Sequence, residues 1–275
     1  MKNKKYLFIF SLILINILLY IFSFSSPDLR VIFFDVGQGD SIFIETPNKH
    51  QILIDGGPSS SNIANKLSSF MPFWDKTIDL IVLTHLESDH VSGLFEILDN
   101  YIVENILWSG EYKESEKSKI WKEMIEKENA NIYISNSLDQ IIMNDVHLKI
   151  IKTDGEITNT NDSSVITKLL YRDNSFLFTG DISSKIEKEI IIQDIQSDII
   201  KIPHHGSKYS SSEEFIKKVS PLLAVIQVGK NSYGHPTDEV LTRLSNFGIK
   251  VLRNDLDGDI QIVSNGIKYK IINKK

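Results

Sequence analysis

The chain has 275 residues, 41% of them hydrophobic, which suffices for one large folded domain and excludes an intrinsically disordered chain. It contains no cysteine, so disulfides and thiol nucleophiles are excluded, and a metal must be held by carboxylates or by the seven histidines. Residues 1–27 hold three of the 30 basic residues and none of the 36 acidic ones, so the remainder has 27 basic residues and a net charge of −9, which argues against a general nucleic-acid coat protein.

An uncharged, strongly apolar run covers residues 6–24 and follows Lys2, Lys4 and Lys5. At about 1.5 Å per residue, a helix of this length just spans a hydrocarbon core of about 30 Å. The lysines predict that the N-terminus stays in the cytoplasm while the rest is exported. We therefore expect an N-terminal hydrophobic helix that holds an extracytoplasmic domain on the cell membrane as a single-pass protein. A signal peptide cleaved after Ser25 is the alternative, and it would give a secreted protein.

We expect one continuous domain over residues 28–275. Runs rich in β-branched and aromatic residues predict strands at residues 31–36, 41–46, 51–54, 78–83, 131–134, 146–151, 164–171, 175–179, 198–202, 222–228, 249–252, 260–263 and 267–271. Helices are predicted at residues 59–70, 91–98, 111–129, 183–192, 211–219 and 237–247. The strands come in two groups that are each followed by helices. This order predicts an α+β domain in which two sheets pack face to face with helices outside.

Side chains that can bind a metal follow the apolar strand predicted at residues 78–83. His85, Asp89 and His90 lie within six residues of the chain, and Glu87 lies between them. Imidazole and carboxylate together form a ligand mixture that zinc or manganese accepts. The alternative is a solvated polar loop in which Ser88 or Asp89 caps the following helix.

Three further strand ends carry polar residues. Asp181 follows a glycine, His204 and His205 are adjacent, and His235 precedes a proline. Each taken alone also fits a turn, a packed histidine or a helix start. However, five of the seven histidines lie in such loops, and a fold without a site does not require that distribution: His85, His90, His204, His205 and His235.

The order of these motifs resembles the metallo-β-lactamase (MBL) superfamily, and within it the exported hydrolase-like domain of the ComEC competence proteins. The resemblance covers nearly all of residues 30–271. It rests on FDVGQGDS (34–41), IDGG (54–57), THLESDH (84–90) with Gly93, NDSS (161–164), TGD (179–181), KIPHHGSK (201–208) and VGKNSYGHP (228–236). It implies a four-layer αββα sandwich with the site along one edge of the paired sheets.

The resemblance also implies a ligand set for two metal positions. The family's leading His-x-His-x-Asp-His motif has Glu87 in place of its second histidine, and its next histidine has no match, because His147 lies inside a predicted strand. The second position keeps all four ligands: Asp89, His90, His205 and the bridging Asp181. The first position keeps His85 and Asp181, with Glu87 as an additional candidate. We expect one firm divalent metal, zinc or manganese, and a second site that is weak or absent, since carboxylate in place of imidazole favours manganese or magnesium.

Further residues of the matching motifs are expected around the metal. Candidates to hold phosphate or to protonate a leaving group are His204, Ser207, Lys208 and His235, and Asp181 is expected at the catalytic centre itself. A supporting role for each is equally open. Residues expected to orient ligands or backbone, or to border the substrate, are Asp35, Asp40, Asp55, Asn161, Asp162 and Ser163.

These expectations predict a metal-dependent hydrolase, because a divalent ion lowers the pKa of bound water to about 7 and stabilises charge on phosphoryl oxygens. Resemblance to ComEC implies a phosphodiesterase or nuclease acting on DNA or another phosphodiester. The chain has one hydrophobic segment where ComEC proteins have many, so we expect a stand-alone hydrolase domain. The alternatives are an MBL-fold hydrolase acting on a lactone, thioester or amide, and a catalytically silent binding module. The sequence indicates no protein partner.

Overall fold

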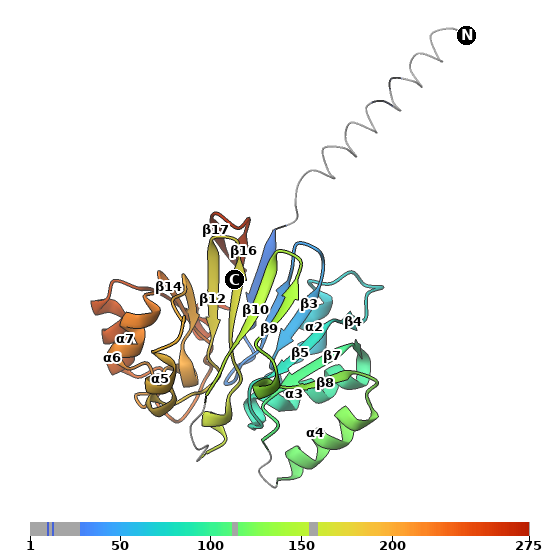
Figure 1. Cartoon of the computed structure of the whole chain (residues 1–275), viewed down its shortest axis with the longest axis horizontal. Helices are drawn as coiled ribbons and strands as arrows, with labels where there is room; N and C mark the ends of the chain where they lie inside the picture. Colours follow the sequence, from blue (N-terminus) through green and yellow to red (C-terminus); the bar gives the residue numbers. More distant parts are fainter. Residues whose placement is uncertain (1–9, 11–12, 14–27, 112–114, 154–158, 275) are drawn as a thin grey trace.

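The computed structural model describes residues 10, 13, 28–111, 115–153 and 159–274, and it contains two β-sheets packed face to face (Figure 1). In spatial order the first sheet contains β17 (Tyr269–Lys274), β16 (Asp259–Ser264), β1 (Leu29–Phe33), β2 (Ile42–Glu45), β3 (Gln51–Ile54), β5 (Leu80–Leu83), β7 (Asn105–Trp108) and β8 (Asn131–Ile134). The second contains β15 (Lys250–Arg253), β14 (Leu223–Ile226), β13 (Ile199–Lys201), β12 (Asn174–Phe178), β11 (Ile166–Tyr171), β10 (Val146–Ile151) and β9 (Gln140–Met143). A small separate sheet pairs β4 (Thr77–Ile78) with β6 (Ile102–Val103).

Helices cover the outer face of each sheet. The first sheet is covered by α2 (Ile63–Ser68), α3 (Ser88–Asn100) and α4 (Glu116–Lys127). The second is covered by α5 (Ser184–Ile190), α6 (Glu213–Val219) and α7 (Asp238–Asn246). Shorter elements are α8 (Asn254–Asp257) and the 3₁₀ turns η1 (Ser135–Ser137), η2 (Asn161–Ser163) and η3 (Pro203–Gly206). The predicted αββα sandwich is confirmed.

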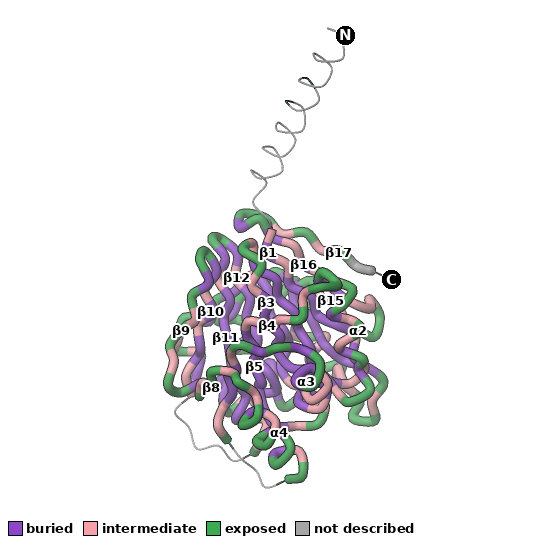
Figure 2. Tube along the Cα trace, turned by 90° about the vertical axis from the view of Figure 1, so that its right-hand side faces the viewer, coloured by how far each residue is buried: buried purple, intermediate pink, exposed green. Residues whose placement is uncertain are grey.

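Strands buried on both faces explain the apolar runs in the sequence. Val31 and Phe33 of β1 belong to the core between the two sheets, while Ile32 packs in the core under the helices. The same strand therefore needs apolar residues in succession rather than in alternation. Figure 2 shows this burial running through the strands, with exposed residues on the outer helices and loops.

Three short strands were not predicted from the sequence: β6, β7 and β9. β7 has only four residues and lies between β5 and β8 in parallel pairing, so neither its length nor an alternating pattern marks it. β9 is a four-residue strand at the edge of the second sheet, and only Met143 in it is buried. Local pattern does not distinguish such short strands from connections, because their partners are distant in the sequence.

The expected N-terminal hydrophobic helix lies outside the described residues, apart from residues 10 and 13. In the described part of the chain, no helix combines the length and apolar character needed to cross a bilayer.

One edge of the sandwich collects the loops that carry the polar motifs. β3, β5 and β7 pair in parallel, as do β12, β13 and β14. Parallel strands end at the same edge of a sheet, so the loops after β3 and β5 meet those after β12 and β13. β1 ends at this edge as well, because two antiparallel pairings connect it through β2 to β3.

A close backbone approach fixes α3 against the loop after β3. Gly56 N donates to His90 O at 2.8 Å, and Gly93 N donates to Gly57 O at 2.9 Å. A Cβ atom on Gly93 would lie 2.0 Å from Gly56 O, which leaves no room for a side chain. The first turn of α3 is thereby positioned beside Asp55.

Gly93→Ala should lower the free energy of unfolding. Alanine favours a helix over glycine by about 1 kcal/mol. The clash with Gly56 O should outweigh that gain, since overpacking costs about 1–3 kcal/mol. Chemical denaturation would measure the difference, with Ser92→Ala as the control on the same helix. A Gly93→Ala protein as stable as the wild type would show that this contact is not tight.

Candidate metal centre

The candidate ligands come from three loops at this edge. The loop after β5 carries His85, and Asp89 and His90 lie in the first turn of α3. Asp181 follows β12, and His205 lies in η3 directly after β13. His205 has φ of 52°, a left-handed conformation that turns the chain sharply at the strand end.

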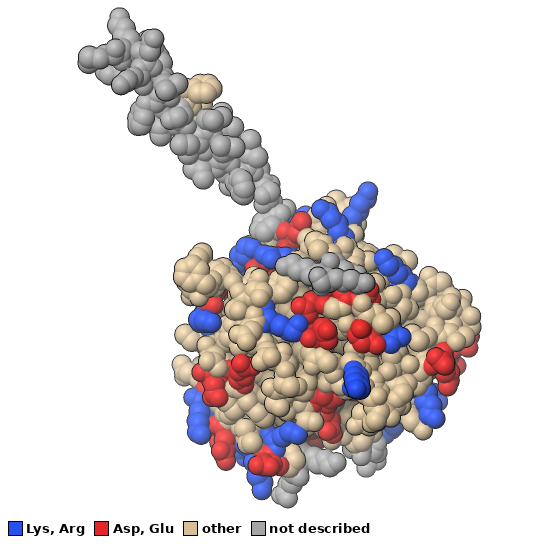
Figure 3. Space-filling model, turned by 180° about the vertical axis from the view of Figure 1, so that it is seen from behind, with Lys and Arg blue, Asp and Glu red and all other residues tan. Residues whose placement is uncertain are grey.

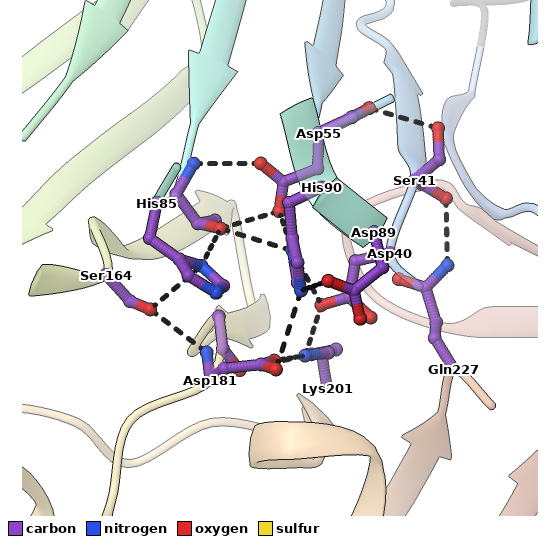
Figure 4. Close-up of polar contacts among 12 residues, drawn as sticks. Asp40, Ser41, Asp55, His85, Asp89, His90, Ser164, Asp181, Lys201 and Gln227 are labelled. Atoms are coloured by element: carbon purple, nitrogen blue, oxygen red, sulfur yellow. Dashed lines mark hydrogen bonds and ion pairs between the residues drawn. The ribbon is translucent and has the colours of Figure 1, made fainter. Parts of the chain in front are cut away.

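The side chains of His85, Asp89, His90 and Asp181 converge (Figure 4). Ligand atoms of His85, His90 and Asp181 lie within 4.8 Å of one another. The same spacing holds for Asp89 with His90 and His205. Other triads with this spacing include Asp40, Asp181 and His205, and Asp40, Asp55 and His90.

A buried carboxylate sets the orientation of His90. Asp55 Oδ2 lies 2.8 Å from His90 Nδ1, and its two oxygens also accept from Thr84 N at 2.8 Å and Thr84 Oγ1 at 2.7 Å. These contacts hold the proton on Nδ1 and aim Nε2 into the cluster. Asp55 therefore acts as the predicted orienting residue.

The other two imidazoles are anchored through Nδ1 as well. His205 Nδ1 donates to the carbonyl oxygen of Gln227 at 2.8 Å. His85 Nδ1 lies 3.0 Å from Thr84 Oγ1 and 3.3 Å from Ser164 Oγ. Both hydroxyls accept from His85, because each donates its own hydrogen to another oxygen. All three rings thus present Nε2 to the same place.

The three Nε2 atoms are buried and have no hydrogen-bond partner among the described residues. Asp181 Oδ2 lies 3.2 Å from His205 Nε2 and 3.5 Å from His90 Nε2, and Asp89 Oδ2 lies 3.3 Å from His205 Nε2. Buried polar atoms are normally satisfied, so three buried Nε2 atoms without a hydrogen bond beside carboxylates fit a site that can hold a cation. This donor set fits a divalent ion such as zinc or manganese.

A buried lysine completes the cluster. Lys201, at the end of β13, is 1% exposed, and its Nζ donates to Gly180 O at 2.8 Å and to Asp181 Oδ1 at 3.1 Å. Its ammonium also pairs with Asp40. Because Lys201 occupies Oδ1 of Asp181, the other oxygen of that carboxylate faces the histidines. Removing one partner of a buried ion pair costs about 3–5 kcal/mol, so these three residues depend on one another.

The carboxylates next to Lys201 are held ionised. Burial raises the pKa of Asp181. The positive charges of His205 and Lys201 act in the opposite direction, and the net pKa lies well below its usual value. Burial also raises the pKa of Asp40, but Lys201, His205 and His90 together lower it by more, so the net direction is downward. The two carboxylates in turn hold the pKa of Lys201 above its usual value despite its burial.

The histidines fall into two classes. Burial and the neighbouring His90 lower the pKa of His85 to about 3, so it is neutral at pH 7. Burial also lowers the pKa of His90 and His205, but Asp181 and other acceptors raise both well above the usual value. Without a metal, His90 and His205 therefore carry protons at neutral pH, and a metal must displace them.

A cavity of about 260 Å³ opens over the cluster. Its lining includes the predicted residues His85, Glu87, Asp89, Asn161, Asp181, His204, His205 and His235. Asn161 Nδ2 lies 3.4 Å from His204 Nε2. Burial lowers the pKa of both His204 and His235, so both are neutral at pH 7.

Other predicted residues lie outside this cavity lining. Lys208 is exposed, with its Nζ over the ring of Tyr209 at 5.2 Å from the centroid. Asp35 accepts from Gly37 N at 3.2 Å. Of the remaining three, Asp162 accepts from Ser183 N, the Ser163 hydroxyl donates to Thr160 O, and Ser207 Oγ accepts from Tyr209 N. Their contacts stabilise loops rather than touch the ligand atoms. Glu87 lines the cavity but belongs to none of the ligand clusters.

Sequence reasoning missed several contributors: Lys201, Thr84, Ser164, Gln227, Gln38 and Tyr233. The sequence could have indicated Lys201, since a lysine at the end of an apolar strand, next to the histidine motif, is unusual. The others are common polar residues in loops or strands, and their roles follow from contacts between segments far apart in the chain.

Comparison with known proteins connects this geometry to a family. The sequence model of the Metallo-beta-lactamase superfamily matches residues 34–230. The chain is 30% identical over 264 residues to ComE operon protein 3 of Bacillus subtilis (strain 168), covering 89% of this chain and 34% of the relative. It is 28% identical over 238 residues to Competence protein ComA of Neisseria gonorrhoeae, covering 85% and 32%. It spans about a third of the length of these relatives.

A solved structure described as a new diphosphatase from the PhnP family has the same fold, with a TM-score of 0.52 and 15% identity. The alignment covers 86% of this chain and 99% of that one.

Asp89→Ala and His205→Ala should each weaken metal binding by at least about 100-fold. Removing a residue that only supports a ligand lowers metal affinity by about 10- to 100-fold, and removing the ligand itself should lower it by no less. Glu87→Ala should leave the affinity near that of the wild type, because Glu87 is outside the ligand clusters. Competition titration of the metal-free protein with a chelating dye and zinc or manganese would measure all three. If Glu87→Ala alone removed the metal, this assignment of ligands would be wrong.

The same titration should show tighter binding as pH rises. His90 and His205 have raised pKa values, so protons compete with the metal for these two side chains. The competition weakens as pH rises, and the metal should therefore bind more tightly. Binding should release protons, which calorimetry in buffers of different ionisation enthalpy detects. Affinity that is constant between pH 6 and pH 8 would contradict this arrangement.

Proposed function

The chain belongs to the metallo-β-lactamase superfamily and has the fold of its metal-dependent hydrolases, and we propose that it hydrolyses phosphodiesters, with DNA as the substrate. The observation that carries this proposal is the cavity, in which the neutral histidines His204 and His235 lie beside the candidate metal ligands His85, Asp181 and His205. A divalent ion bound there supplies a Lewis acid for a phosphoryl oxygen and lowers the pKa of water to about 7.

The residues around the cluster suit an anionic substrate. His204 and His235 are neutral at pH 7, so each offers one N–H donor to a phosphate oxygen. Asn161 lines the same cavity and adds an amide. Because their pKa values are lowered, these histidines are better suited to hold the phosphate than to give it a proton.

Similarity to known proteins supports the choice of substrate. One relative is named a competence protein, and one structure with this fold is described as a diphosphatase. The first name refers to competence and the second to phosphate chemistry, and both agree with a phosphodiester substrate as we propose it. Activity on DNA is our proposal for this chain, which corresponds to only part of its relatives.

The surface charge predicts how DNA would be held. In Figure 3, lysine and arginine side chains are interspersed with aspartate and glutamate on the visible face. The net charge of −9 after residue 27 repels a polyanion. We therefore propose that the metal and the cavity donors provide most of the attraction for the substrate, so binding without metal should be weak.

We also propose that the domain lies outside the cytoplasmic membrane, held by the apolar segment at residues 6–24. β1 begins at Leu29 and the site residue Asp40 follows its far end, so the site is at the end of the first sheet remote from the point where the chain enters the domain. The site would then face away from the membrane, toward substrates in solution. Protease accessibility of the domain on intact cells tests this location, and recovery of the full-length chain in the cytosol would contradict it.

Metal-loaded protein should cleave bis(p-nitrophenyl) phosphate and DNA, and Asp181→Asn should reduce kcat by at least about 100-fold. An asparagine can keep the contact to Lys201 through its oxygen, but its NH₂ group then faces the histidines and cannot bind a metal. Thermal unfolding of the metal-free variant should change much less than activity. No cleavage of any phosphodiester with zinc, manganese or magnesium, together with turnover of a lactone or thioester, would overturn the proposal.

A further inference from the structure

We propose that Tyr233 is the platform on which a nucleobase of the substrate stacks, so that the substrate is single-stranded nucleic acid with its scissile phosphate at the metal cluster. This inference rests on the proposed phosphodiesterase function and names its substrate class. Stacking on a protein ring requires an unpaired base, because the bases of a duplex are already stacked on each other.

A row of rings connects Tyr233 to the metal ligands. The Tyr233 ring centroid lies 5.8 Å from that of His235 with an interplanar angle of 31°. The His235 ring lies 5.6 Å from that of His204, which lies 6.1 Å from that of the candidate ligand His205. The row therefore runs from the cavity rim, past the two proposed phosphate donors, to the metal.

Tyr233 lines the cavity and is 73% exposed, so most of its side chain is accessible to a ligand at the cavity. Single exposed aromatic residues are common on protein surfaces. Tyr209 is such a residue, because it is 67% exposed but is not among the residues that line the cavity. The combination of exposure and position in the cavity distinguishes Tyr233, and Tyr209 provides a matched control.

The loop that carries Tyr233 is held in place by Asn231. The Asn231 Oδ1 atom accepts from Tyr233 N at 3.0 Å and from His235 N at 3.1 Å. Its Nδ2 atom donates to Gly229 O at 2.9 Å and to His235 O at 2.8 Å. Both rings are thus on a loop with a fixed backbone, which reduces the entropy lost when a ligand stacks.

The loop is also docked on the opposite wall of the cavity. A Cβ atom on Gly229 would lie 2.3 Å from the carbonyl carbon of Gly37, so the two backbones are in direct contact. Gln38 Oε1 accepts from Gly229 N at 3.4 Å, and the Gln38 side chain lines the cavity. An amide group therefore lies at the same cavity as the tyrosine ring and can hydrogen-bond to the edge of a base.

This arrangement favours a nucleobase over other substrate groups. Every base presents a planar π-face, and stacking on an aromatic side chain tolerates any sequence. The donors that would hold a phosphate lie directly beside the ring, as a nucleotide requires. A simple lactone or thioester has no planar aromatic group to use the ring.

The experiment compares kcat/KM on oligothymidylate with that on an abasic deoxyribose-phosphate oligomer of equal length, using the metal-loaded protein. The wild type should prefer the base-containing oligomer, and Tyr233→Ala should reduce that preference by about 5- to 100-fold, mostly through KM. Tyr233→Phe should retain most of the preference, because it keeps the ring. Tyr209→Ala should behave like the wild type. A readout independent of turnover is binding of thymidine 5′-monophosphate by calorimetry, which Tyr233→Ala should weaken by a similar factor.

Three results would overturn the platform: a wild type that does not distinguish the two oligomers, equal losses by Tyr233→Ala on both, or a Tyr209→Ala effect of the same size. If Tyr233→Ala lost binding to a cell-wall oligosaccharide but bound the nucleotide as the wild type does, the ring would be assigned to a sugar instead. A wild type that cleaves neither oligomer contradicts the proposed function. In that case the calorimetry with thymidine 5′-monophosphate still tests the platform. Failure of the platform can therefore be told apart from failure of the proposed function.

Discussion

The Asp181 carboxylate can serve a metal only because Lys201 fixes and neutralises one side of it. The buried ammonium holds Oδ1, so Oδ2 faces His90 and His205 at 3.5 and 3.2 Å. A carboxylate in this position without Lys201 would be a buried charge with a large desolvation cost. The second contact of Lys201, to Asp40, connects the loop after β1 to the same centre. One side chain thereby joins the two sheets at the site.

The histidine ligands are also oriented by contacts with other segments of the chain. Each ligand ring is held at Nδ1 by a residue from another segment: Asp55 after β3 holds His90, and the carbonyl of Gln227 after β14 holds His205. Parallel strands bring these segments to one edge, and the glycine contact between α3 and the loop after β3 sets the distance. The site is therefore a product of strand order and close backbone packing, and the cofactor would enter a pocket whose ligands are already oriented.

The sequence predicted much of this, and the residues show why. The apolar runs predicted an α+β domain of two packed sheets, and the resemblance of the motifs to the metallo-β-lactamase superfamily implied the αββα sandwich. The five histidines expected in strand-end loops lie together, three of them in the metal cluster and two at the cavity. Lys201 was missed as a site residue because its place at the end of an apolar strand does not reveal its partners Asp40 and Asp181, which come from other segments. Lys208, expected to hold phosphate or protonate a leaving group, is exposed and outside the cavity lining, and that expectation stays a prediction. Short strands such as β7 depend on pairing, which no local pattern reveals.

Anomalous diffraction from crystals grown with zinc or manganese would test the central claim most directly. The account predicts a peak at about 2.0–2.3 Å from Nε2 of His90 and His205 and from carboxylate oxygens of Asp89 and Asp181. It also predicts that Lys201 keeps its contact with Asp181 in the loaded protein. A peak bound elsewhere, or an ion that displaces Lys201 from Asp181, would contradict the arrangement on which the proposed chemistry depends.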